Sequence, residues 1–170
     1  MAVFDLFLFT VLCSITIFLF FYCNHLHINK INKAKKLQGI IWLKHFRMLL
    51  SAIQQHRGLT MGYLNGDDTL LQRIKPLEKD IHEKMREINS INGWLTDNLT
   101  WIGINDHWLR LSKSYTKYES EHNFRQHCNL ITNLLHLIEE CAENHHLQEL
   151  ICTNQENANF LWAQLLITAE

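Results

Sequence analysis

The sequence contains very little proline and glycine, with 1 Pro and 6 Gly among 170 residues. A sheet of many short strands needs frequent turns, and tight turns draw heavily on these two residues. Their scarcity argues against a many-stranded sheet and favours long helices. The length suits one domain of ordinary size with a short appendage.

The chain also lacks a strong net charge and a paired set of cysteines. Its formal charge is -1 at pH 7, so no basic excess is present to neutralise phosphates, and we expect no nucleic-acid partner. The 5 cysteines are odd in number and show no close paired spacing. This pattern predicts no disulfide framework and favours a reducing compartment.

One long apolar segment stands at the N-terminus. Residues 3–22 are nearly all Phe, Leu, Ile and Val, broken by Asp5, Thr10, Ser14 and Thr16. About 20 apolar residues in a helix are enough to span the hydrocarbon core of a bilayer. A cleaved signal peptide is the alternative, but the segment lacks a basic start and a small-residue end. We therefore expect an uncleaved, single-pass transmembrane anchor over residues 1–29.

The segment after the anchor is basic. No acidic residue interrupts the cations that follow the anchor, and Asp5 is the one charged residue before them; the cations are Lys30, Lys33, Lys35, Lys36, Lys44 and Arg47. Positive charge concentrates on the cytoplasmic side of membrane helices. We expect an inner (cell) membrane protein with a juxtamembrane linker at residues 30–36 and a cytoplasmic domain at residues 37–170.

Apolar residues in this domain recur at steps of three and four, which is typical of amphipathic helices. The pattern predicts helices over residues 37–64, 69–95, 120–142 and 158–170, with Pro76 kinking the second or marking its true start. The run Asn65-Gly66-Asp67-Asp68 predicts the end of the first helix. The expected buried stripe of the second helix is Ile74, Leu77, Ile81, Met85, Ile88, Ile91 or Asn92, and Leu95. The third helix is expected to be capped by Ser120 with Glu121 and to bury Phe124, Cys128, Ile131, Leu135, Ile138 and Ala142. Residues 97–106 are rich in Asn, Thr and Gly and predict a loop before a short helical stretch. The expected fold class is all-α: an antiparallel helical bundle with one N-terminal transmembrane helix.

One cation interrupts the apolar stripe of the first predicted helix of the domain. Arg57 stands at the fifth position of the series that runs Leu43, Phe46, Leu50, Ile53, 57, Met61 and Leu64. A buried cation needs an anion or a route to water. The guanidinium can snorkel outwards, pair with Glu78 or Glu121, or hold a diffusible planar oxyanion on its parallel N–H donors. Gly58 and Gly62 remove side-chain bulk nearby, for either a ligand or close helix packing.

The run of residues 54–64 reads Gln-Gln-His-Arg-Gly-Leu-Thr-Met-Gly-Tyr-Leu and resembles the signature of nitrate- and nitrite-sensing domains. The resemblance extends more loosely to residues 123–127 and to the order of the helices. It implies an all-helical sensor in which arginines from different helices surround a small oxyanion. Carried over, it implies that the ligand-binding residues are Arg57, Thr60, Arg125, Gln55 and Gly58, with His56 a weaker candidate.

Two departures from that family shape the expectation. Family members continue into a further helix with a Glu, Gly and Arg motif, whereas this sequence stops near Ala169 and Glu170; we therefore expect the pocket to be incomplete here. Many such receptors also place the sensing domain outside the membrane and a signalling domain inside. We accordingly expect a homo-oligomer or a separate signalling partner to complete and read the sensor.

Other chemistries fit the sequence less well. Cys141 and His145 stand four residues apart, and His127 and Cys128 precede them, but this spacing matches no tight metal motif, so we expect core packing and no metal or cofactor. The sequence contains no phosphate loop, nucleophile elbow or HExxH motif, and we expect no enzyme. The alternative function is a membrane-tethered scaffold or dimerisation module in which Arg57 meets a partner's carboxylate.

Overall fold

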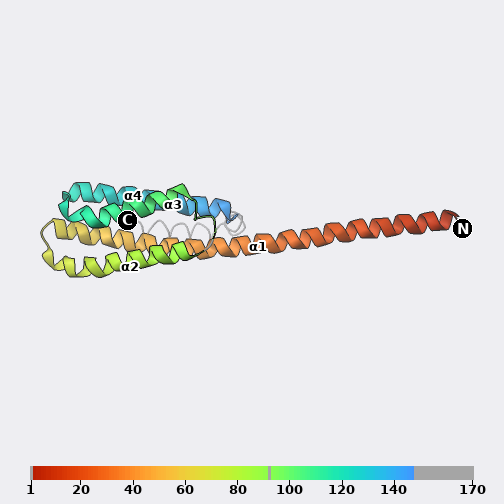
Figure 1. Cartoon of the computed structure of the whole chain (residues 1–170), viewed down its shortest axis with the longest axis horizontal. Helices are drawn as coiled ribbons and strands as arrows, with labels where there is room; N and C mark the ends of the chain where they lie inside the picture. Colours follow the sequence, from red (N-terminus) through yellow and green to blue (C-terminus); the bar gives the residue numbers. More distant parts are fainter. Residues whose placement is uncertain (1, 92, 148–170) are drawn as a thin grey trace, which may run out of the picture. The chain divides into compact units, whose positions relative to one another are not determined.

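The computed structural model describes residues 2–91 and 93–147 (Figure 1). Its elements are α1 (Ala2–Leu64), η1 (Asp68–Leu70), α2 (Leu71–Ser90), α3 (Leu99–Ser114), η2 (Tyr115–Lys117) and α4 (Ser120–Asn144). No strand occurs among the described residues, which confirms the predicted all-helical class. The chain divides into two compact units, one ending at Gln38 and the other beginning at Gly39.

The first unit consists of the N-terminal part of α1. Its large apolar side chains are exposed, and they include Phe9, Leu12, Ile15, Ile17, Phe18, Leu19, Phe20 and Phe21. Thr16 Oγ1 donates a hydrogen bond to the Cys13 carbonyl oxygen at 2.8 Å, which satisfies this hydroxyl within the helix. By length and composition, α1 is apolar enough near the N-terminus to cross a membrane.

The second unit comprises the rest of α1 with α2, α3 and α4, which lie side by side around one apolar core (Figure 1). Each helix contributes residues at helical spacing. The largest fully buried side chains are Trp42, Trp108, Tyr115, Phe46, Leu49, Ile53, Ile74, Ile81, Ile88, Ile104, Leu111 and Leu130. At one end of the unit, α4 comes close to α1, where the Cys141 thiol lies 3.9 Å from the Gly39 carbonyl oxygen.

The predicted end of the first helix is confirmed. α1 ends at Leu64, and Gly66 has a φ of 105°, which a residue with a side chain rarely adopts. The Asp67 carboxylate accepts a hydrogen bond from the Thr69 backbone N–H at 3.1 Å, and so caps η1. The chain therefore reverses within a few residues.

The predicted bounds of the second helix were wrong at its C-terminal end. α2 covers Leu71–Ser90 and stops five residues before the expected end, because the backbone of Ile91 is extended. Pro76 lies inside α2, so it does not mark the start of the helix. The five buried residues of α2 follow the predicted stripe closely: Ile74, Leu77, Ile81, Met85 and Ile88.

The predicted loop at residues 97–106 is mostly helix, so that prediction was wrong. The Asn98 side chain accepts a hydrogen bond from the Trp101 backbone N–H at 2.8 Å and caps α3. Trp101, Ile104 and Trp108 then bury one face at helical spacing. The polar residues that suggested a loop supply the cap and the solvent-exposed face instead.

α4 begins at Ser120 as predicted, but its cap and part of its buried face differ from the prediction. The N-cap residue is Glu119, with no side-chain capping bond. Phe124 is 41% exposed although it was expected in the core. Ile131, Ile138 and Ala142 are buried as predicted, and the buried face also includes Asn123, His127, Leu130 and Leu134. The predicted helix at residues 158–170 lies outside the described residues.

Candidate functional site

The buried stripe of α1 passes through His56, not Arg57. Its fully or nearly buried members are Trp42, Phe46, Leu49, Leu50, Ile53, His56 and Thr60. His56 is 0% exposed, whereas Arg57 is half-buried at the edge of the stripe. The prediction that Arg57 occupies the middle of the seam was therefore wrong by one residue, or about 100° of helical rotation.

The Arg57 guanidinium lies against α4. Its Cζ is 5.2 Å from the centroid of the Phe124 ring, within the range of a cation–π interaction. Nη1 donates a weak hydrogen bond to the Cys128 sulfur at 3.6 Å. Arg57 forms no ion pair with any residue in the described part of the chain. Most of its N–H donors thus remain uncommitted to protein acceptors there.

Thr60 joins α1 to α4 deep in the core. Its hydroxyl lies 2.8 Å from the His56 carbonyl oxygen, to which it donates, and it accepts a hydrogen bond from Asn123 Nδ2 at 3.0 Å. Thr60 and Asn123 are both 0% exposed. The predicted hydroxyl donor is therefore already engaged within the protein.

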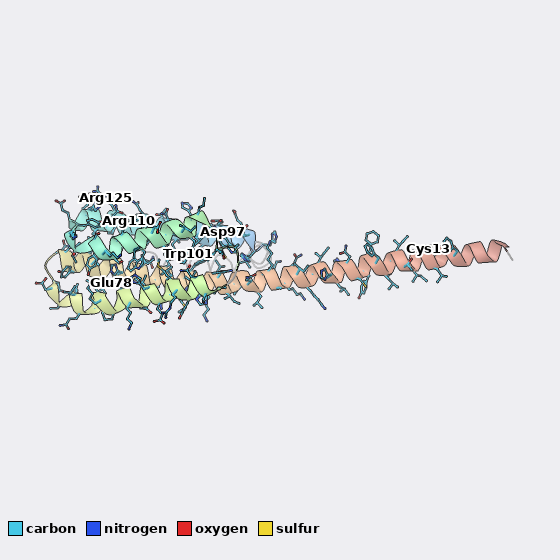
Figure 2. The ribbon with its side chains drawn as sticks, in the orientation of Figure 1. Cys13, Glu78, Asp97, Trp101, Arg110 and Arg125 are labelled. Atoms are coloured by element: carbon cyan, nitrogen blue, oxygen red, sulfur yellow. The ribbon has the colours of Figure 1, made fainter. Side chains whose placement is uncertain are left out.

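The remaining predicted ligand residues lie elsewhere. Gln55 and Gly58 are exposed on α1. Arg125 points outwards from α4 with a 63% exposed side chain, and its Nη1 lies 3.4 Å from Glu121 Oε1 (Figure 2). The polar partner of Arg125 is thus Glu121, whereas Arg57 lies against Phe124 and Cys128. Of the five predicted residues, the structure brings Arg57 and Thr60 to α4 and leaves the other three at the surface.

The glycines near Arg57 differ in their surroundings. A Cβ added at Gly62 would lie 2.5 Å from Leu70 Cδ1, so a side chain there would require the end of Leu70 to move. A Cβ at Gly58 would meet nothing within 4 Å. No neighbour among the described residues therefore requires glycine at position 58.

We expect Gly58→Ala to stabilise the protein by about 0.5 to 1 kcal/mol, because alanine loses less backbone entropy in a helix. Gly66→Ala should destabilise it by about 1 kcal/mol, because its φ is strained for alanine. Urea unfolding of both variants measures the difference. A loss of stability in Gly58→Ala would show that this position carries a constraint beyond the packing described here.

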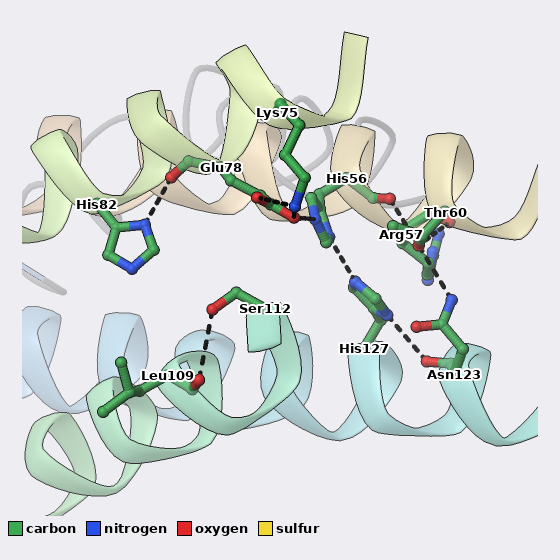
Figure 3. Close-up of polar contacts among 10 residues, drawn as sticks. All are labelled: His56, Arg57, Thr60, Lys75, Glu78, His82, Leu109, Ser112, Asn123 and His127. Atoms are coloured by element: carbon green, nitrogen blue, oxygen red, sulfur yellow. Dashed lines mark hydrogen bonds and ion pairs between the residues drawn. The ribbon is translucent and has the colours of Figure 1, made fainter. Parts of the chain in front are cut away.

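Two buried histidines connect α1 with α4 (Figure 3). His56 Nδ1 and His127 Nε2 are 2.8 Å apart, and His127 Nδ1 is 2.9 Å from the Asn123 carbonyl oxygen. Since a carbonyl only accepts, His127 Nδ1 must carry a proton. Burial lowers the pKa of His127 to about 3, and the positive charge of neighbouring Arg57 adds to that effect. Neutral His127 then accepts at Nε2, so His56 Nδ1–H is the donor.

Glu78 on α2 faces the other ring nitrogen of His56. His56 Nε2 lies 3.7 Å from Glu78 Oε1, which is too long for a hydrogen bond, while Lys75 Nζ lies 3.0 Å from Glu78 Oε2. Burial lowers the pKa of His56, and its interaction with Glu78 opposes that shift. Burial alone would raise the pKa of Glu78, but interactions with His56 and Lys75 outweigh it, so this pKa is lowered.

Aromatic rings enclose His56. Its ring centroid is 4.9 Å from that of Trp108 and 5.5 Å from that of Tyr115, both in edge-to-face arrangement. Burial raises the pKa of the Tyr115 hydroxyl, and the negative charge of Glu78 adds to this. The site is thus a polar cluster inside an apolar and aromatic wall.

Most residues of this cluster were not predicted from the sequence. His127, Asn123 and Glu78 were not predicted as site residues, and His56 was ranked low. One available signal was the series 42, 46, 49, 53, 56 and 60, which alternates steps of four and three and contains His56 and Thr60. A second was the four-residue spacing of Asn123 and His127, which places both on one helix face.

Metal-binding side chains do not converge in the described residues. No group of three or more His, Cys, Asp or Glu side chains could hold a metal ion there. Cys141 Sγ lies 3.8 Å from His145 Nδ1, and both residues are buried. Burial raises the pKa of the Cys141 thiol to about 12, which keeps it protonated. This pair acts as packing in the described structure.

A surface cavity of about 390 Å³ lies away from the polar cluster. It is lined by residues at the end of α2, the start of α3 and the connection between them: Ile88, Asn89, Ile91, Leu95, Thr96, Trp101, Ile102, Asn105 and Asp106. None of the predicted ligand residues lines it. The candidate site is therefore the Arg57 edge of the α1–α4 seam, not this cavity.

Comparison of the chain with protein-family models, curated proteins and solved structures found no match. The resemblance to nitrate- and nitrite-sensing domains therefore stays a prediction carried by residues 54–64.

Proposed function

We propose that the chain is a membrane-anchored sensor that binds a small oxyanion, nitrate or nitrite, at Arg57 and passes the signal on by repacking its helices. The observation that carries this proposal is the state of the Arg57 guanidinium. It is half-buried, lies over Phe124 and has no carboxylate partner among residues 2–91 and 93–147. Such a cation can bind an external anion without first breaking an ion pair to a described residue.

The chemistry of the guanidinium favours a planar oxyanion. Its parallel N–H donors match two oxygens of one ligand, which a lysine ammonium does not. Contact with the face of Phe124 leaves the N–H edge of the guanidinium free to donate. The family resemblance of residues 54–64 narrows the anion to nitrate or nitrite.

The proposed route of the signal follows from the position of Arg57 between α1 and α4. An anion at the N–H edge of Arg57 would compete with the Nη1 hydrogen bond to Cys128, which holds the guanidinium against α4. Any binding that favours one packing of α1 and α4 over another shifts the population between them. We propose that the helices form an antiparallel bundle, and that a second copy or a separate signalling partner reads this shift.

The membrane part of the proposal rests on the first unit. Its exposed Phe, Leu and Ile side chains would be unfavourable in water and favourable in lipid. The basic residues after the apolar segment support a cytoplasmic second unit, because positive charge concentrates on the cytoplasmic side of membrane helices. We accordingly propose a single-pass anchor in the inner membrane.

We expect nitrate or nitrite to raise the melting temperature of the full chain in detergent micelles, relative to chloride at equal concentration. An anion at 100 times its Kd stabilises the folded state by about 2.7 kcal/mol, or roughly 5 to 10 °C for a chain of this size. The fluorescence of the five tryptophans reports unfolding.

The rise should vanish in Arg57→Ala and fall strongly in Arg57→Lys. Arg86→Ala is the matched control, because Arg86 is an exposed cation of α2 that pairs with Glu83. Equal melting temperatures in nitrate, nitrite and chloride for the wild type would contradict the proposal, as would a nitrate effect that persists in both Arg57 variants.

A further inference from the structure

α2 and α4 both present polar side chains to His56, and the hydrogen bonds from His56 into α4 run in one direction (Figure 3). The Asn123 carbonyl oxygen accepts from His127 Nδ1–H, and His127 Nε2 accepts from His56 Nδ1–H. Both nitrogens of His127 are therefore used while the ring is neutral. A proton added to this cluster therefore binds to a different nitrogen.

That nitrogen is His56 Nε2. It is buried and has no hydrogen-bond partner among the described residues. It faces Glu78 Oε1 at 3.7 Å. With both groups unprotonated at these atoms, a lone pair on nitrogen faces a carboxylate oxygen, and nothing draws them together. One proton on Nε2 turns this repulsive pair into a donor and an acceptor of opposite charge.

We propose that His56 Nε2 is a reversible proton-binding site, and that the bound proton joins α1 to α2 through a charge-assisted hydrogen bond to Glu78. The proton comes from solvent and no other bond is made or broken. The Glu78 side chain is 13% exposed, so it gives the site contact with water. This inference goes beyond anion binding at Arg57 and does not depend on it.

The charged and titratable groups around the His56 ring determine the pH at which it takes up the proton. α2 presents Glu78, which favours the cation, and Lys75, which opposes it. The other titratable or charged groups near the two rings are Arg57 on α1, His127 on α4, His107 on α3 and Tyr115 in η2. Since burial lowers the pKa of His56, the proton is taken up at a pH below the ordinary pKa of histidine.

Before His56 is protonated, Glu78 already pairs with Lys75, and it can keep this pair afterwards. Lys75 Nζ binds Oε2 at 3.0 Å, while Oε1 is the atom that faces His56. A carboxylate accepts on both oxygens. Closing the 3.7 Å gap to the usual length of about 2.8 Å for a charge-assisted bond requires less than an ångström of movement.

Ring-nitrogen NMR of the full chain in detergent micelles, labelled with ¹⁵N-histidine, tests the proposal. The signals of His56 and His127 are identified by their loss in His56→Gln and His127→Gln. As the pH falls from 7 to 4, the His56 signal should change from the neutral to the cationic pattern, while His127 keeps its neutral Nδ1–H pattern. Protonation of His127 before His56 would overturn the proposal.

Two conservative variants on α2 should shift the His56 titration in opposite directions. Glu78→Gln removes the favourable charge and should lower the midpoint by about one pH unit. Lys75→Met removes the opposing charge and should raise it by a smaller amount. Glu83→Gln, on an exposed part of the same helix, is the control and should leave it unchanged.

An unchanged midpoint in Glu78→Gln would overturn the proposal, because the proton would not then be bound toward Glu78.

The Arg57→Ala variant separates this inference from the proposed anion sensor. It should abolish the nitrate response and retain the His56 titration. Loss of the titration in Arg57→Ala, with the fold intact, would overturn the assignment of the proton to the His56–Glu78 pair.

Discussion

Acidification from pH 7 is expected to destabilise the folded protein, with His127 as the largest single contributor. Its folded-state pKa of about 3 lies below the ordinary value of 6.5, so the unfolded chain binds more protons between these values. Stability is therefore fully present above pH 6.5 and is lost as the pH falls toward 3. The loss from this residue is about 2 kcal/mol at pH 5 and about 4 kcal/mol at pH 3.

Urea unfolding of the full chain in detergent micelles at several pH values measures this loss. His127→Gln cannot titrate, so its stability should depend less steeply on pH, even if it is lower at pH 7 because the bond from His56 is altered. His136→Gln is the control on the same helix, since the His136 side chain is 68% exposed. Parallel pH curves for the wild type and His127→Gln would contradict the prediction.

Replacing Trp108 by alanine should cost about 3 to 5 kcal/mol of stability. The side chain is 1% exposed and packs edge-to-face on His56 at 4.9 Å. Its removal loses the transfer free energy of a large ring and leaves a cavity that the surrounding helices cannot fill. The cavity would also admit water beside His56, and the loss of burial should raise the pKa of that histidine.

Trp108→Phe is the informative comparison. The indole Nε1 has no hydrogen-bond partner among the described residues, so phenylalanine forfeits volume but no protein hydrogen bond and should cost less than alanine. Leu109→Ala, at an exposed neighbouring position, should change stability by less than about 1 kcal/mol. A Trp108→Ala variant as stable as Leu109→Ala would show that the core around His56 is not packed as described.

Much of the helical layout could be predicted from the sequence, because it depends on local signals. The end of α1 followed from the Asn-Gly-Asp run, and the stripe of α2 followed from regularly spaced aliphatic residues. The start of α3 could not be predicted in this way. Asn98 and the polar residues after it are as compatible with a loop as with the start of a helix. The helix is favoured because it buries Trp101 and Trp108 in the core, which local sequence does not reveal.

The candidate site was harder to predict, because a search for apolar stripes excludes polar core residues. On α1 the buried stripe contains His56 and Thr60. A search for apolar residues passes over both of them and joins Ile53 to Met61 through position 57. On α4 the same bias selected Phe124 over Asn123. The polar residues are tolerated in the core because each finds a partner on another helix, which sequence periodicity does not reveal.

The hydrogen bonds from α1 to α4 also bear on how these helices can slide. The hydrophobic effect is non-directional, so it opposes a shift of one helical turn, about 5.4 Å along the axis, less specifically than hydrogen bonds do. The His56–His127 and Thr60–Asn123 bonds do not survive such a shift, and the four buried groups would lose their partners together. These two bonds fix the register of α1 against α4, so a signal carried by α1 has to be a rotation, a tilt or a displacement well below one turn.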